Sequence, residues 1–271
     1  MYTEENKIFW LNRLGICPTK HPFHIVNPSP LPFFAALAGG LTTSSFVGYM
    51  HYHVCPTIRL SFFFSVLFLT LVSSKWFYDI IQEKPHHTTE VVRGLAMGMA
   101  LFIVSEVMFF FSFFFAFFYS ALSPSVGIGC VWPPKGIIPL DPYSLPLLNT
   151  VILVSSGVTL TWAHCGIRAD DRKELVDGLF FTILLGVVFT CFQVFEYSTA
   201  TFYMDDGIYG SIFYMSTGFH GFHVILGTLF LLVCLVRAHF FGHFDWRDHF
   251  GVEAAAWYWH FVDVVWLFLY M

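Results

Sequence analysis

The sequence predicts an all-α polytopic membrane protein with seven transmembrane helices. Of its 271 residues, 56% are hydrophobic and only 11% are charged, whereas charged residues make up about 25% of a soluble globular domain. The hydrophobic residues gather in seven runs, each long enough to cross a bilayer as a helix. This composition excludes a soluble enzyme, and the absence of a basic cluster argues against a nucleic-acid partner.

The elements follow one another in a simple order. Residues 1–30 should form a surface arm, because the prolines of HPFHIVNPSP exclude regular helix. Residues 31–271 form the transmembrane domain, in which GCVWPPKGIIPLDP is a proline-rich loop between the third and fourth helices. The predicted helices cover residues 31–50, 57–80, 91–120, 143–164, 175–197, 208–236 and 250–271.

The basic residues support this count and set the orientation. With the N-terminus on the inner side, eleven of the thirteen Lys and Arg residues lie on or near that side. Only Arg59 and Lys135 fall on the outer side. Because cytoplasmic or matrix loops carry an excess of basic residues, the N-terminus is expected inside and the C-terminus outside.

The third helix carries a single acid in a long apolar run. As a helix, residues 91–120 would extend roughly 45 Å, which is more than the ~30 Å hydrocarbon core of a bilayer. Glu106 lies near the middle of this run. An ionised acid at the bilayer centre costs at least ~2.5 kcal/mol, so Glu106 is a candidate functional group that is protonated or hydrogen-bonded. The alternative is a structural acid that only bonds a neighbouring helix.

One face of the same helix is formed by small residues. Successive helical residues are about 100° apart, so these small residues fall within about 40° of one another. Small side chains let helix backbones approach closely in lipid, so this face is expected to press on a neighbouring helix, with Glu106 at its flank. The residues of this small-residue face are Gly94, Gly98, Ser105, Ser112 and Ala116.

Other polar residues inside the apolar runs could bind a metal or link helices. His220 and His223 are three residues apart on one face, and paired histidines can hold haem or copper. No second pair at matching depth follows, so hydrogen bonding between helices is favoured over a metal site. Glu253 and Asp263 are expected to pair with His260 or with a tryptophan indole. The full set of candidates is His164, Gln193, Glu196, His220, His223, Glu253, Trp257, His260 and Asp263.

Several segments together resemble the subunit III family of cytochrome c oxidase. They are HIVNPSPLP, LFIVSEVMFF, WPPKGI, PLLNT, SSGVTLTWAH, YGSIFYMSTGFHGFHVILG and FGVEAAAWYWHFVDVVWLFLY, in the order of that family, and they cover nearly the whole chain from His24. The resemblance implies a non-catalytic subunit of a proton-pumping oxidase. Haem a, haem a3 and copper would belong to partner subunits I and II, and cytochrome c would be met through the complex.

The resemblance also implies an architecture and a set of lipid contacts. Two helices and five helices would be separated by a cleft filled with structural phospholipids, and Glu106 would be the carbodiimide-reactive acid bordering it. The positions that match the family's lipid contacts are Trp76, Glu83, His87, Glu106 and Arg237. The chain departs from the family's usual residues at Gln82, Phe115, Tyr119 and Cys165.

The implied location is the mitochondrial inner membrane, with the N-terminus in the matrix and the C-terminus in the intermembrane space. Accessory subunits would be further partners. Two other functions remain open at this point. One is subunit III of a quinol oxidase. The other is a proton-coupled transporter that uses Glu106 as its carrier, although the broken helices and inverted repeats of such transporters are missing from the sequence.

Overall fold

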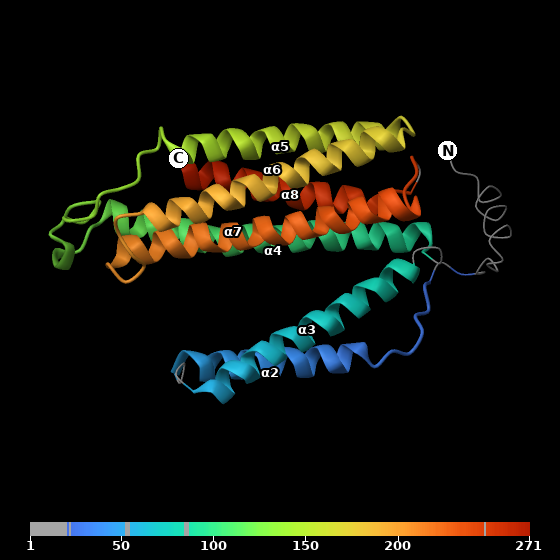
Figure 1. Ribbon diagram of the computed structural model, residues 1–271, viewed down its shortest axis with the longest axis horizontal. Helices are drawn as coiled ribbons and strands as arrows, with labels where there is room; N and C mark the ends of the chain where they lie inside the picture. The colour runs from blue at the N-terminus through green and yellow to red at the C-terminus, as the bar shows by residue number, and fades with distance from the viewer. Residues whose placement is uncertain (1–20, 22, 52–54, 84–86, 247) are drawn as a thin grey trace. The chain divides into compact units, whose positions relative to one another are not determined.

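A computed structural model describes residues 21, 23–51, 55–83, 87–246 and 248–271, which form seven long helices and no strand (Figure 1). A short 3₁₀ turn, η2 (Val126–Ile128), lies in the proline-rich loop, and a π turn, η3 (Arg237–Phe241), continues α7. The helices are α2 (Leu31–His51), α3 (Pro56–Glu83), α4 (Thr89–Leu122), α5 (Leu145–Arg168), α6 (Arg172–Thr199), α7 (Ile208–Val236) and α8 (Phe250–Tyr270).

The seven predicted helices are confirmed, with ends within four residues of the predicted ones. Six of them, α2 to α7, are long and apolar enough to cross a membrane. The seventh, α8, has the same 21-residue length as α2 but carries Glu253, His260 and Asp263. Its crossing of the membrane therefore stays a prediction. In the predicted surface arm, residues 23–29 form no helix, whereas residues 1–20 lie outside the described part of the chain.

The chain divides into two compact units, Met1–Leu95 and Ala96–Met271. In the first unit α2 packs along α3. The Ser45 and Ser65 hydroxyls are 2.8 Å apart across this contact, and the rings of Tyr49 and Phe62 stack with centroids 5.5 Å apart. A pair of hydroxyls and a pair of stacked rings thus link these two helices, and the hydroxyl pair is of the kind that joins helices in lipid.

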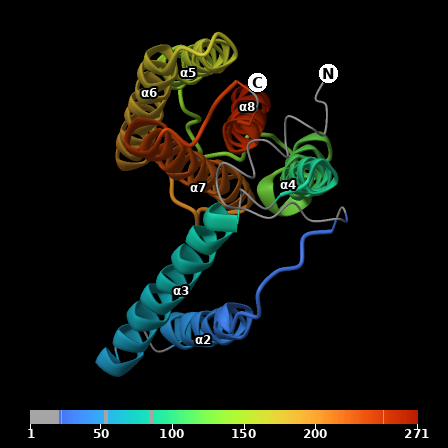
Figure 2. The ribbon, with the colours of Figure 1, turned by 90° about the vertical axis from the view of Figure 1, so that its right-hand side faces the viewer.

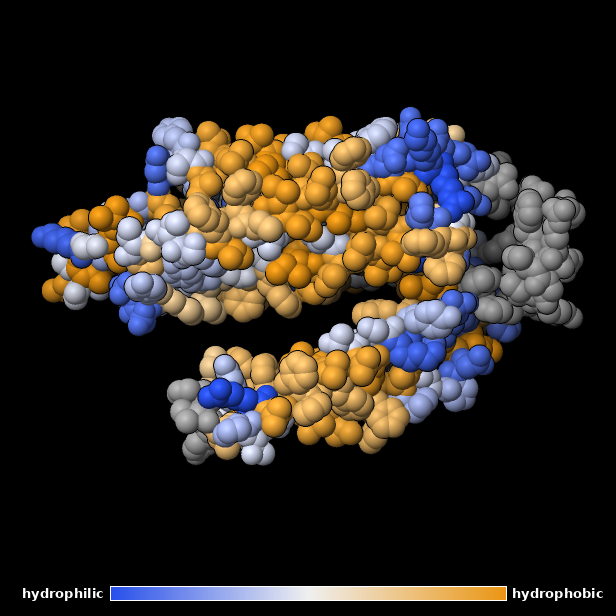
Figure 3. Space-filling model, viewed as in Figure 1, coloured by the Kyte–Doolittle hydropathy of each residue, from blue (hydrophilic) through white to orange (hydrophobic). Residues whose placement is uncertain are grey.

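In the second unit, four helices form a closed ring. Helix α5 contacts α6, α6 contacts α7, α7 contacts α8, and α8 returns to α5 (Figure 2). The α6 helix begins at an N-cap, Asp171, whose carboxylate accepts hydrogen bonds from the Lys173 and Glu174 amides at 2.8 and 3.2 Å. Hydrophobic residues cover the middle of the helices, and hydrophilic ones gather toward their ends (Figure 3). This banding is typical of a bundle that crosses a bilayer.

The closest approach in the ring joins α5 and α6. A Cβ added to Gly178 would lie 2.7 Å from the Ala163 Cβ and 2.8 Å from the Ala163 amide nitrogen. The hydroxyls of Thr159 and Thr182 are 2.8 Å apart one turn further along. Glycine at position 178 therefore allows the two backbones to meet, and the threonine pair adds an interhelical hydrogen bond.

The centre of the ring is filled by Trp259 of α8, which is fully buried. Its indole N–H donates to the Ser156 hydroxyl at 2.9 Å. A Cβ added to Gly186 of α6 or Gly227 of α7 would lie 2.7 or 2.9 Å from the Trp259 ring. Three other helices of the ring therefore each supply a small residue to accommodate this one side chain.

Helix α4 packs beside the ring through large side chains. Phe109 of α4 meets Phe219 of α7 with ring centroids 5.0 Å apart, and Phe114 meets Phe268 of α8 at 6.0 Å. The buried face of α4 repeats every three or four residues, as one face of a helix must. Its members are Met99, Ile103, Glu106, Phe110, Phe113 and Phe114.

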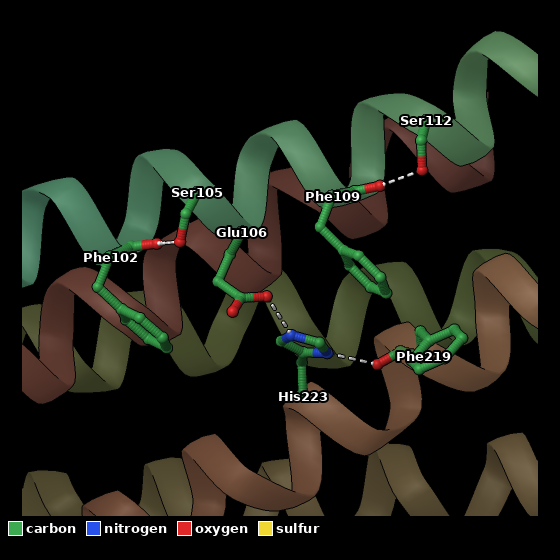
Figure 4. A network of polar contacts seen from close by, with 7 residues as sticks. All are labelled: Phe102, Ser105, Glu106, Phe109, Ser112, Phe219 and His223. Carbon is green, nitrogen blue, oxygen red and sulfur yellow. Dashed lines mark hydrogen bonds and ion pairs between the residues drawn. The ribbon is translucent and has the colours of Figure 1, made fainter.

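The prediction that the small-residue face of this helix presses on a neighbour is wrong for α5–α8. Gly98, Ser105 and Ser112 are exposed in the second unit, and a Cβ at Gly98 would meet nothing within 4 Å. Figure 4 places Ser105 and Ser112 on the side of α4 away from His223. Because α4 is apolar on every side, the pattern of its hydrophobic residues did not identify the face that packs. The contact is formed by bulky aromatic side chains.

Candidate functional site

Glu106 is hydrogen-bonded to His223 across the contact between α4 and α7 (Figure 4). Glu106 Oε2 lies 2.9 Å from His223 Nε2, and the other ring nitrogen, Nδ1, lies 2.6 Å from the carbonyl oxygen of Phe219. The side chains of Glu106 and His223 are 22% and 9% exposed. The predicted hydrogen bond of the midplane acid is therefore present, and His223 is its partner.

The two hydrogen bonds limit how many protons the Glu106–His223 pair holds. A carbonyl oxygen only accepts, so His223 Nδ1 must carry a proton. The pair then shares one further proton, held either by the Glu106 carboxyl or by His223 Nε2. In both arrangements the pair has no net charge, which lowers the cost of keeping an acid at this depth.

Aromatic rings surround the Glu106–His223 pair. The rings of Phe110 and Tyr258 lie 5.0 and 6.3 Å from the His223 ring, and Phe109 stacks over it at 6.3 Å. These rings offer few competing hydrogen bonds, and the low dielectric they create strengthens the bond between the acid and the imidazole. The hydrogen bond between Glu106 and His223 is therefore enclosed by aromatic side chains of α4 and α8.

The two histidines of α7 do not form one site. His220 is fully buried, and its Nε2 lies 3.2 Å from the Val262 carbonyl oxygen of α8. Because a carbonyl oxygen only accepts, Nε2 carries the proton and donates this hydrogen bond. The His220 ring packs on Phe189 and Trp266 with centroids 5.7 and 5.1 Å away. The predicted role of these histidines in hydrogen bonding between helices is confirmed.

A third histidine cluster lies at the end of the ring where α5 ends and α8 begins. His249 Nε2 is 3.2 Å from Glu253 Oε1, and His164 Nε2 is 3.9 Å from the same oxygen. Together they are a group of ligand atoms within 4.8 Å of one another among the described residues. The nearest contact in this group joins Glu253 to His249, and His249 was not among the sequence candidates.

The prediction that Glu253 pairs with His260 or a tryptophan is wrong. His249, one turn before Glu253, is nearer to it along the helix than His260, two turns after it. The buried indoles of α8 donate instead to hydroxyls of α5: Trp259 to Ser156, and Trp266 to Thr150 at 3.0 Å. Serine and threonine on the facing helix therefore supply the acceptors that the sequence reading assigned to acids.

Of the remaining α8 candidates, Asp263 and His260 lie against α5. A Cβ added to Gly157 would meet Asp263 Oδ2 at 3.2 Å and the His260 ring at 3.6 Å. Trp257 is 41% exposed. Gln193 and Glu196, near the end of α6, are buried at 5% and 4% exposure.

The positions that match the family's lipid contacts fall in both units. In the first unit, Trp76 is exposed on α3, Glu83 ends that helix, and His87 places its ring 5.0 Å from that of His24. In the second unit, the Arg237 guanidinium lies over the Phe244 ring, 4.5 Å from its centroid, and Glu106 is bonded to His223. Their contact with lipid stays a prediction.

We expect Glu106 and His223 to contribute jointly to the stability of the protein, because each is the hydrogen-bond partner of the other. Replacing either by alanine leaves the other polar group unpaired, so the two changes should not be additive. A double-mutant cycle of Glu106→Ala and His223→Ala should give a coupling of roughly 0.5–2 kcal/mol in unfolding measurements on the detergent-solubilised protein. In the matched control cycle, Ser105→Ala on the exposed face of α4 takes the place of Glu106→Ala. The losses of stability caused by Ser105→Ala and His223→Ala should then add. Equal coupling in both cycles would contradict the hydrogen bond.

The fold and the site together define a multi-pass helical membrane protein in which an acid at the middle of α4 is bonded to a histidine of α7. The family is shown by comparison: residues 21–271 match the model of cytochrome c oxidase subunit III. The chain belongs to that family. It is 52% identical over 256 residues to cytochrome c oxidase subunit 3 of Pylaiella littoralis, which covers 93% of each chain. It is 52% identical to the subunit of Scyliorhinus canicula and 51% to that of Dugong dugon, each over 93% of this chain and 95% of the relative.

Membership in this family makes the chain a multi-pass subunit of an oxidoreductase complex of the respiratory chain, in an inner membrane and in the company of other oxidase subunits. The resemblance noted in the sequence is thereby confirmed.

Proposed function

We propose that the chain is a non-catalytic core subunit of respiratory complex IV that binds no haem or copper itself. The single observation that carries this is the engagement of His223. One of its ring nitrogens is bonded to Glu106 and the other to the Phe219 carbonyl, so this histidine is occupied in joining helices. In this proposal haem a, haem a3 and copper are held by partner subunits, where oxygen is reduced to water.

The proposed contribution of the chain is structural and electrostatic. It would stabilise subunit I, sustain proton uptake into it, and hold phospholipids through Trp76, Glu83, His87, Glu106 and Arg237. A rigid ring of four helices with α4 packed beside it suits a scaffold of this kind. The Glu106–His223 pair would keep an acid at the bilayer midplane without net charge and without requiring it to carry protons through the chain.

The proposed setting is the mitochondrial inner membrane, with the N-terminus on the matrix side and the C-terminus on the side of the intermembrane space. The basic residues support this orientation through the positive-inside rule. Partners would be subunits I and II and the accessory subunits, with cytochrome c docking to the complex as a whole.

The test is Glu106→Gln in the assembled oxidase. A glutamine side chain keeps the volume of the acid and can donate a hydrogen bond to His223 Nε2. In this proposal electrons pass only through the haem and copper of partner subunits. The Glu106→Gln complex should therefore assemble, keep its haem absorbance and reduce oxygen at an unchanged initial rate. Oxygen consumption and the visible spectrum of complex purified through a tag on this chain measure both properties.

Ser105→Ala, on the exposed face of α4, is the matched control. Loss of oxygen reduction in an assembled Glu106→Gln complex would overturn the supporting role. Tight haem in the chain after its separation from the complex would overturn its non-catalytic character. Proton-coupled flux in liposomes that contain this chain alone would instead favour the transporter.

A further inference from the structure

A cavity of about 270 Å³ lies in the second unit, at the end where α6 and α8 end and α5 and α7 begin. Its size corresponds to about nine waters at the ~30 Å³ that each occupies in the liquid, and it is smaller than the pockets that enclose drug-sized ligands. It therefore suits a headgroup or a small part of a ligand. About half of its lining residues are aromatic, among them Phe113, Phe117, Tyr209, Phe213, Trp266 and Phe268.

Two polar side chains of α6, Gln193 and Glu196, also line this cavity. Glu196 is 4% exposed and Gln193 is 5% exposed. Glu196 Oε2 and both amide atoms of Gln193 are buried and make no hydrogen bond with the described residues. Leaving such buried groups unpaired is unfavourable, so a partner that fills the cavity and bonds to them would be stabilising.

The carboxyl group narrows the chemistry of that partner. Glu196 takes part in none of the ion pairs found among the described residues. A carboxylate beside several aromatic faces is the environment that binds an ammonium group, because both the acid and the rings attract a cation. An anionic ligand would be repelled, and a neutral alcohol would use only the hydrogen-bonding capacity of the site.

The depth of Glu196 suits the same kind of ligand. It lies three residues before the end of α6 at Thr199, or about 4.5 Å along the helix axis. Glu106, by contrast, lies deep inside α4. Because the ends of a membrane-crossing helix lie near the lipid headgroups, we expect the cavity at the level where headgroups meet the hydrocarbon.

We propose that this cavity binds the ammonium group of an amphipathic molecule, with Glu196 as its counter-ion and the aromatic walls around its methyl or methylene groups. The site is separate from the Glu106–His223 pair and from the lipid contacts proposed above. Its occupant is either the headgroup of a zwitterionic lipid or a free alkylammonium compound.

The test uses a photoreactive trimethylammonium amphiphile with a twelve-carbon chain, crosslinked to the intact oxidase complex and mapped by peptide mass spectrometry. Crosslinks should fall on peptides that carry Phe117 or Phe213. Dodecyltrimethylammonium should compete, whereas dodecanol should not. Competition by dodecylphosphocholine points to a lipid headgroup, and competition by tetramethylammonium alone points to a small free cation.

Glu196→Gln, which keeps the side-chain volume, should lower the crosslinking at these peptides at least tenfold. Asp205→Asn removes one negative charge from an exposed loop position between α6 and α7 and should leave it unchanged. Haem absorbance and subunit composition report on assembly of each variant. If Glu196→Gln fails to assemble, the competition series on the unsubstituted complex still decides, because equal competition by dodecanol would overturn the proposal. Undiminished crosslinking in an assembled Glu196→Gln complex would overturn it as well.

Discussion

Gly178→Ala should separate α5 from α6 and destabilise the second unit. The added methyl would lie 2.7 Å from the Ala163 Cβ and 2.8 Å from the Ala163 nitrogen. Backbone atoms cannot rotate away as the end of a flexible side chain can, so the helices themselves must move apart. Overpacking of this kind typically costs about 1–3 kcal/mol. The expected result is a lower amount of subunit in the purified complex and a lower melting temperature.

The matched control is Gly221→Ala in α7. A Cβ at Gly221 would meet nothing within 4 Å, so the same substitution in another apolar helix should have little effect. If both variants were equally stable, the close contact of α5 and α6 at Gly178 would be refuted.

The number of helices and their ends could be predicted from the sequence because they depend on local properties. Apolar length, proline-rich breaks and the distribution of Lys and Arg are all visible along the chain. The seven helices lie within four residues of the predicted bounds for this reason. In the same way, the place of Glu106 at the middle of α4 followed from its position in a run of apolar residues.

The partners of the polar groups could not be predicted in the same way. His223 lies 117 positions after Glu106, and Ser156 lies 103 positions before Trp259. Neither pairing leaves a signal at short spacing. Where spacing alone was used, as for Glu253 and His260, the nearer His249 proved to be the partner. The orientation of α4 was missed because phenylalanine surrounds this helix, so the pattern of hydrophobic residues marks no single face.

The ring of four helices depends on one tryptophan to a degree that the sequence does not reveal. Trp259 and Trp257 stand two positions apart in the same apolar helix, yet Trp259 is fully buried and Trp257 is 41% exposed. The difference arises from Gly186 and Gly227, which leave room for the Trp259 ring from two other helices. Gly186 in α6 and Gly227 in α7 thus determine which indole enters the core.

Trp259→Ala should therefore be the most damaging single substitution in the second unit. It removes the largest fully buried side chain and leaves a cavity where α5, α6 and α7 converge. It also leaves the Ser156 hydroxyl without the indole N–H that now donates to it at 2.9 Å. Truncating a buried tryptophan costs about 3–5 kcal/mol, because the lost packing contacts are not recovered by relaxation of the neighbours.

Trp257→Ala removes an exposed indole of the same helix and should lower the stability of the subunit far less. The measurement is the monodisperse fraction that remains after heating in detergent, determined by size-exclusion chromatography. Trp259→Phe should fall between the two, since it keeps an aromatic ring but not the hydrogen bond. An equal loss in Trp257→Ala and Trp259→Ala would mean that stability follows the number of aromatic residues in α8. If instead stability falls most in Trp259→Ala, less in Trp259→Phe and least in Trp257→Ala, it depends on the fit of the Trp259 ring against Gly186 and Gly227.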